Sequence, residues 1–227
     1  MRRKMKGLAA QIAMIAMANV TWSQADCSAD INGDFVVDLD DLLVLLIHYG
    51  DSCEDATSAY PSIYISEIHY NPHSSQGNDS DWEFLELYNP NPYPLSLAQW
   101  SLNNAVELTF QGTDTLPTMG YFTVARNLDS LATVLPSSAF ARQWNSGQSL
   151  NNTGETIEVR APDGTVIASV SYEDNDGWVP EPDGSGPSLE WMDAGLPNDA
   201  PDSWTFSLIP GGTPGQENSM WGLSDPE

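Results

Sequence analysis

The stretch DWEFLELYN, residues 81–89, decides the fold class. Side chains alternate along it with a period of two, which is the repeat of a β-strand. One face carries Trp82, Phe84, Glu86 and Tyr88, and the other carries Glu83, Leu85 and Leu87. The alternation therefore predicts a strand with two different faces, and it points Glu83 and Glu86 in opposite directions.

Other short runs share this richness in β-branched and aromatic residues and are separated by turn clusters such as NPNPYP and LPTMG. These runs are IYISEIHY (63–70), YFTVA (121–125), TIEVRA (156–161) and TVIASVSY (165–172). APDGT, residues 161–165, predicts a tight hairpin between the last two. Short strands at this spacing favour a mainly β fold, an Ig-like sandwich or barrel.

Several segments, in this order and spacing, resemble the lamin tail domain of bacterial secreted proteins. They are 63–72 (IYISEIHYNP), 81–102, 116–127, 154–172, 183–191 and 211–218 (GGTPGQEN). The resemblance implies an Ig-like β-sandwich over residues 63–218, with a linker at 56–62 and a polar tail at 219–227. It also implies a non-catalytic accessory domain that makes protein contacts.

A second motif precedes this domain. Oxygen-bearing side chains occupy positions 1, 3, 5, 9 and 12 of a twelve-residue loop, with a backbone carbonyl available at position 7. This spacing suits a calcium ion, which takes six to eight oxygen ligands. The predicted ligands are Asp30, Asn32, Asp34, Val36, Asp38 and Asp41.

Directly after the loop, residues 41–49 predict a short helix with a leucine-rich face. Leu42, Leu43, Leu46 and Ile47 form its candidate partner-docking face, because a lone helix this short is not stable in water. Residues 27–53 together resemble one repeat of a dockerin type I module, an EF-hand-like unit, although Phe35 stands where such loops usually have glycine. The resemblance implies that calcium is the cofactor.

Cys27 and Cys53 bracket this unit of residues 26–55, and an even pair in an exported chain predicts a disulfide. Zinc binding is the alternative. Residues 1–25 combine a basic start, an apolar run and the small residues SQA, so they predict a signal peptide cleaved before Asp26, with a retained anchor as the other possibility. The protein is thus expected to be secreted, at or outside the cell surface, with no membrane insertion after cleavage.

The charge of the processed chain limits the classes of partner that it can bind. Four of the seven basic residues lie in the signal peptide, which leaves three against 32 acidic residues, a formal charge of −29. Such a surface repels phosphate backbones and favours divalent cations, so nucleic acid is not an expected partner.

We therefore expect a calcium-binding, non-enzymatic binding or structural protein whose partner is another protein or a second copy, in self-assembly. One alternative is a polysaccharide-binding module that uses Trp100, Trp178, Trp191 and Trp204, for which core packing is the competing explanation. The other alternative is a metal-dependent hydrolase or nuclease. His69 and His73, with Glu67, Glu83 and Glu86, could be drawn as a metal site, but the pattern favours a polar strand end.

Overall fold

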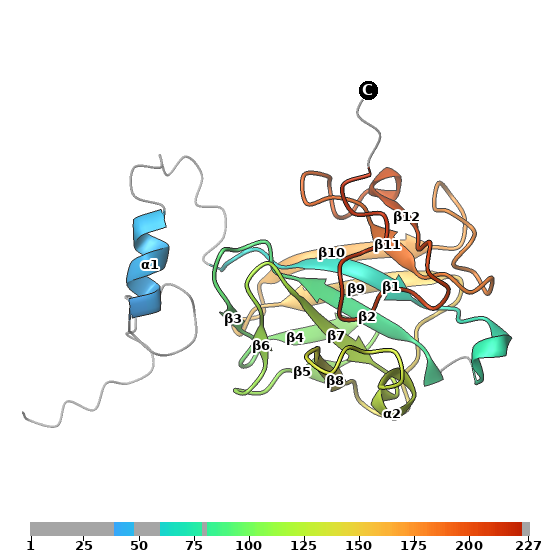
Figure 1. The fold of residues 1–227 in the computed structure, drawn as a ribbon, viewed down its shortest axis with the longest axis horizontal. Coiled ribbons are helices and arrows are strands. Elements are labelled where there is room, and N and C mark those ends of the chain that lie inside the picture. Colours follow the sequence, from blue (N-terminus) through green and yellow to red (C-terminus); the bar gives the residue numbers. More distant parts are fainter. Residues whose placement is uncertain (1–38, 48–59, 79–80, 224–227) are drawn as a thin grey trace, which may run out of the picture.

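The structure, a computed structural model, describes residues 39–47, 60–78 and 81–223. Its described part is mainly β, as the sequence predicted, with few and short helices (Figure 1). The elements are α1 (Leu39–Ile47), β1 (Tyr64–His69), η2 (Ser74–Gln76), β2 (Phe84–Tyr88), β3 (Leu95–Ser96), β4 (Ser101–Asn104), β5 (Leu108–Thr109), β6 (Thr115–Leu116), β7 (Tyr121–Ala125), α2 (Leu128–Leu131), β8 (Phe140–Gln143), β9 (Gly154–Arg160), β10 (Val166–Glu173), β11 (Leu189–Trp191), η4 (Pro201–Ser203) and β12 (Trp204–Phe206).

The larger sheet has six strands in the order β12-β11-β1-β2-β7-β8. All neighbours are antiparallel except β7 and β8, which run parallel. The first strand of the domain, β1, therefore lies inside the sheet, between its sequence neighbour β2 and the late strand β11.

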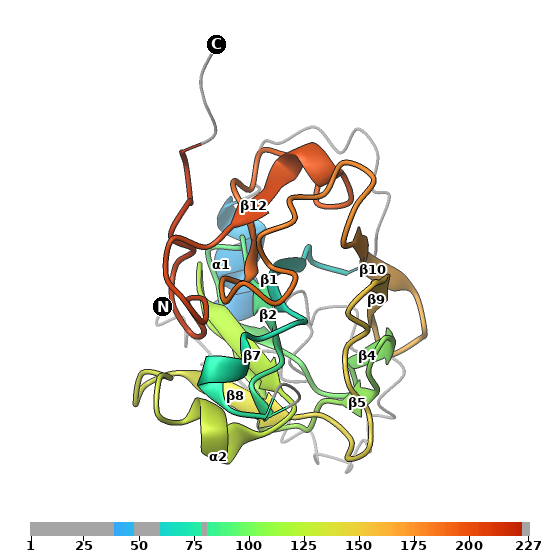
Figure 2. The ribbon, with the colours of Figure 1, turned by 90° about the vertical axis from the view of Figure 1, so that its right-hand side faces the viewer.

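The second sheet has the order β10-β9-β4-β5, and β3 and β6 form a separate two-stranded ladder. The hairpin predicted at residues 161–165 joins β9 and β10. Gly164 has a φ of 90° there, and the Asp163 side chain accepts a hydrogen bond from the Thr165 amide. Figure 2 shows this sheet facing the six-stranded one, an arrangement consistent with an Ig-like sandwich.

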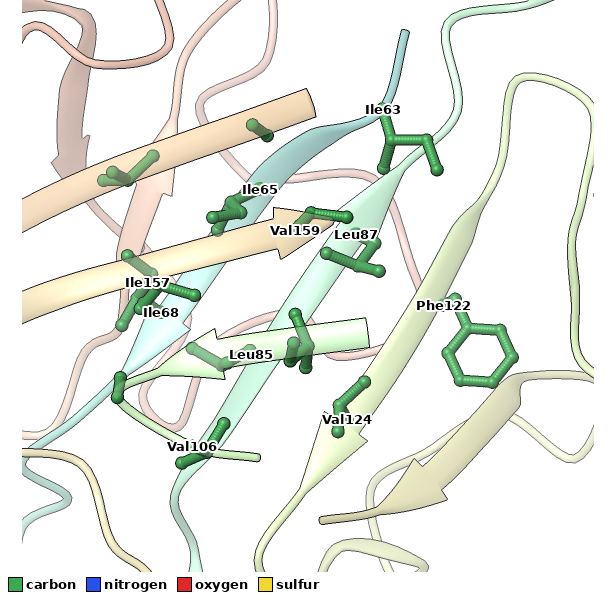
Figure 3. Close-up of a cluster of buried hydrophobic side chains, with 14 of the residues drawn as sticks. Ile63, Ile65, Ile68, Leu85, Leu87, Val106, Phe122, Val124, Ile157 and Val159 are labelled. Atoms are coloured by element: carbon green, nitrogen blue, oxygen red, sulfur yellow. The ribbon is translucent and has the colours of Figure 1, made fainter. Parts of the chain in front are cut away.

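The hydrophobic core fills the space between the two sheets (Figure 3). Leu85 and Leu87 of β2, which the alternation placed on one face, enter it together with Ile157 and Val159 of β9. A register shift between Ile65 and Glu67 marks a β-bulge in β1. Ile65 and Ile68 both reach the core across this irregularity, because the extra residue resets the alternation.

The other face of the six-stranded sheet is also covered. Phe84, Ala125 and Leu131 form a small second cluster that places α2 against this face. The segment Gly211–Met220, which we call the strap, bonds to β1, β2 and β11 on the same side. Every residue of β2 is consequently buried.

Only part of the N-terminal unit lies within the described residues. The predicted helix is present as α1, which begins two residues earlier than expected, at Leu39. Both cysteines lie outside the described residues, as do the predicted signal peptide and the predicted ligands Asp30, Asn32, Asp34, Val36 and Asp38. No helix in the described part of the chain is long and apolar enough to cross a membrane.

Candidate functional site

Three glutamates line up across the middle of the six-stranded sheet. Glu67 of β1 is directly opposite Glu190 of β11 on one side and Glu86 of β2 on the other. All three are fully buried. Facing residues on antiparallel strands have Cβ atoms only about 5 Å apart, so three carboxyl groups are held close together away from water.

The strap supplies the hydrogen-bond donors for this glutamate row. The Thr213 amide donates to Glu67 Oε1 over 2.8 Å, the Gly215 amide donates to Glu86 Oε2, and the Ser219 hydroxyl donates to Glu190 Oε2 over 2.8 Å. At least one donor group of the strap thus bonds to each glutamate. The glutamate row therefore holds the strap, near the C-terminal end of the domain, against strands β1, β2 and β11.

The Thr213 hydroxyl sits between two of the carboxyl groups. Its Oγ1 lies 3.1 Å from Glu67 Oε2 and 3.0 Å from Glu190 Oε1. A hydroxyl group has a single hydrogen to donate. Both contacts are satisfied when one carboxyl is protonated and donates to Oγ1, while Oγ1 donates to the other carboxyl.

Burial raises the pKa of two members of the row, Glu67 and Glu86. It raises the pKa of Glu67 to about 8, helped by the charge of Glu190 and opposed by hydrogen bonds from Ser188 and Thr213. Burial, and then the charge of Glu67, raise the pKa of Glu86 well above its usual value. At neutral pH, Glu67 therefore keeps its proton.

A glycine lets the strap approach this closely. Gly212 has a φ of 80°, and a Cβ there would overlap Glu67 Oε1 and press on Ser188 and Phe84. Glycine is the residue that adopts such a φ without strain and leaves room for the carboxyl group.

An apolar groove of about 350 Å³ opens beside the strap. Trp82, Val134, Ile209, Pro210 and Pro214 give it apolar walls, and Gly211, Gly212, Gln76 and Gln216 complete the lining. None of the described residues that line it carries a charge. In a chain with 32 acidic residues, an uncharged groove of this kind favours an apolar ligand.

The leucine-rich helix presents a second apolar surface. Leu39, Leu42, Leu43 and Leu46 of α1 are 67%, 46%, 49% and 56% exposed, whereas Asp41 is buried. These four positions follow the i, i+3, i+4, i+7 spacing of one helical face. The predicted docking residues Leu42, Leu43 and Leu46 are thus accessible, and Ile47 is the last residue of the helix.

The tryptophans proposed for sugar stacking belong to the interior. Trp100, Trp178, Trp191 and Trp204 are all buried, and the rings of Trp178 and Trp204 lie 6.0 Å apart. This confirms core packing for these four residues. They form no platform on which a sugar could stack.

The histidine and glutamate pattern does not converge on a metal site. His69 is buried, which lowers its pKa to about 4 with Gln76 acting in the opposite direction, whereas His73 is exposed and bonds to Ser75 beside η2. Glu83 accepts from the Leu150 amide, away from the glutamate row. Within the described residues, no group of three or more His, Cys, Asp or Glu side chains is placed to hold a metal.

The two facing sheets of the described residues are consistent with an Ig-like β-sandwich domain. Residues 56–174 match the Lamin Tail Domain family, and the chain belongs to this family. Its domains are generally non-catalytic and mediate protein–protein contacts. No curated protein matches the chain.

The glutamate row and the groove were not predicted from the sequence. A signal was present, because Glu67, Glu86 and Glu190 each interrupt an apolar or aromatic strand segment: SEIHY, FLELY and LEW. A buried carboxyl group needs partners. The glycine-rich GGTPG stretch at residues 211–215 is the segment that supplies them.

Proposed function

We propose that the chain is a secreted, calcium-binding, non-catalytic protein that makes protein–protein contacts in an extracellular or cell-surface assembly. The lamin tail sandwich provides a rigid body, and α1 provides an adhesive face. The partner is a protein or a second copy of the chain.

The observation that carries the proposal is the exposed leucine face of α1. Burying an apolar side chain stabilises by roughly 1.5–3 kcal/mol, so an exposed row of leucines is a strong driving force for association. A helix of nine residues is too short to be stable by its own hydrogen bonds. A partner that covers the leucine face would bury these side chains and would also stabilise the short helix.

Calcium enters the proposal through the loop that precedes the helix. The ligand spacing from Asp30 to Asp41 places the last ligand inside α1, so bound calcium would couple the loop to the helix. This coupling is the support for a calcium-dependent adhesive face.

A calcium titration by calorimetry tests the metal site. Residues 26–227 should bind about one ion, and the Asp30→Ala variant, which lacks the first ligand, should bind none at the loop. The matched control is Asp163→Ala, which removes an acidic side chain from the β9–β10 turn and should leave the titration unchanged. Equal binding by the wild type and Asp30→Ala would contradict a site in this loop.

A capture experiment tests the adhesive face separately. The chain, immobilised through its C-terminus in calcium, should retain a protein partner or a second copy of itself from the surface extract of its own cells. The double variant Leu42→Asp and Leu46→Asp should lose this retention. Identical retention by both forms would show that α1 is not the contact surface.

A further inference from the structure

We infer that the apolar groove beside the strap binds the leucine face of α1 from a second copy, so that molecules join head to tail. This inference rests on the proposed function, because it names the partner of the same adhesive helix. It adds the receiving surface, which is the groove lined by Trp82, Val134, Ile209, Pro210 and Pro214.

The spacing of the exposed leucines suits recognition by an apolar groove. Leu39, Leu42, Leu43 and Leu46 project from successive turns, and recognition of a helix by a groove uses i, i+3, i+4 and i+7 anchors of this kind. The groove is open at its rim, where Val134 and Ile209 are 49% and 50% exposed. Apolar side chains that are half exposed on both partners would become buried in one contact.

The two surfaces also match in charge. Among the described residues, the polar side chains that line the groove are the amides of Gln76 and Gln216, and the four exposed leucines are uncharged. Elsewhere the chain is strongly acidic, so two copies repel each other at low salt. Their contact should therefore strengthen as salt screens this repulsion, which is opposite to the behaviour of an interface held by ion pairs.

The groove lies near the end of β1 opposite to the end at which the chain enters the β domain. The chain leaves the N-terminal unit at Tyr60 and enters β1 at Tyr64, whereas Gln76 and Trp82 lie in the connection between the far end of β1 and the start of β2 (Figure 1). The six residues of β1 span about 20 Å. The described chain thus enters the sheet at one end of β1, and the groove opens toward the other end.

A contact between the helix of one copy and the groove of another sets the symmetry of the assembly. Contacts between two different patches on identical molecules are heterologous, and each added molecule leaves one free helix and one free groove. The expected product is an open chain of molecules. A symmetric dimer would require one patch to contact itself.

Complementation between two full-length processed variants tests the inference by sedimentation velocity in calcium and moderate salt. The helix variant carries Leu42→Asp and Leu46→Asp, and the groove variant carries Val134→Asp and Ile209→Asp. Each variant alone should be monomeric, with association weakened on the order of 30-fold or more, the factor for loss of an interface hot spot. Mixed one to one, they keep one intact helix and one intact groove, so they should form dimers and nothing larger.

Val166→Asp is the matched control, because Val166 is 43% exposed but lies on β10 in the other sheet. It should assemble like the wild type, and unchanged thermal unfolding of all variants shows that they remain folded. Assembly of the groove variant alone would overturn the inference in favour of helix–helix contact. A wild type that stays monomeric at all concentrations would also overturn it, while the calcium titration and the capture experiment would still decide the proposed function.

Discussion

A buried, protonated glutamate gives this domain an unusual response to pH at the scale of one residue. In the unfolded chain Glu67 ionises near its ordinary pKa of 4.5, but in the folded protein burial raises that pKa to about 8. Between these values the folded state holds a proton that the unfolded state releases. The contribution of protonated Glu67 to stability is therefore complete below pH 4.5 and is lost as the pH rises to 8.

Glu67→Gln should remove this loss of stability at rising pH. Glutamine keeps an oxygen for Ser188 and the Thr213 amide, and its NH₂ group can donate to Thr213 Oγ1. The free energy of unfolding can be measured with urea at several pH values. Between pH 4.5 and 8, that of the variant should rise relative to the wild type by up to about 1.4 kcal/mol per pH unit. Parallel curves for the two proteins would show that Glu67 is not the group that holds the proton.

Gly212→Ala tests the close approach of the strap. The added Cβ overlaps Glu67 Oε1 at a positive φ, so we expect a loss of about 3 kcal/mol in the free energy of unfolding. Gly164→Ala is the control, since Gly164 also has a positive φ but no atom lies within 4 Å of its Cβ position. It should lose only about 1 kcal/mol, and equal losses would remove the steric argument.

At the scale of elements, the strap and the sheet stabilise each other. The Asn218 side chain donates to the Ser66 and Trp191 carbonyls over 2.8 Å each, which adds backbone contacts to those made by the glutamate row. The bulge in β1 lies at the same place, between Ile65 and Glu67. The strap thus bonds to β1 at the position of its bulge.

Thr213→Val should loosen the strap without changing its shape. Valine lacks the hydroxyl that lies between Glu67 and Glu190, so we expect a loss of about 2 kcal/mol and faster amide exchange at Gly215. Thr213→Ser keeps the hydroxyl and should stay close to the wild type in both measurements. If valine and serine behave alike, the hydroxyl does not hold the strap.

At the scale of the whole molecule, the sandwich continues past the family match. That match ends at residue 174, but β11 pairs with β1 from the other side, β12 pairs with β11, and the strap follows. A chain ending at residue 174 would leave Glu67 buried in part, with neither Ser188 nor Thr213 to bond it.

Truncation tests this boundary. Residues 26–174 should lack a cooperative thermal transition and be digested rapidly by protease, because β1 loses its neighbour β11 and its cover. Residues 26–223 should unfold in one transition. Cooperative unfolding of the shorter chain would place the folding unit within the matched residues.

The sequence predicted the parts of this fold that depend on local pattern. The alternation in residues 81–89 predicted a strand with Leu85 and Leu87 on one face, and the PDG turn predicted the β9–β10 hairpin. The pairing of Glu67 with Glu190 could not be predicted in this way, because it joins residues 123 positions apart through strand order alone. The groove combines Trp82, Val134 and Ile209, which no local spacing connects.

The interior position of β1 has a mechanical consequence. A pull on Tyr60 is directed along β1, while the hydrogen bonds of its antiparallel neighbours β2 and β11 run across it. Such a force must shear two ladders at once and cannot open either one bond at a time. The strap crosses the same three strands, so the entry point of the chain is built to resist tension.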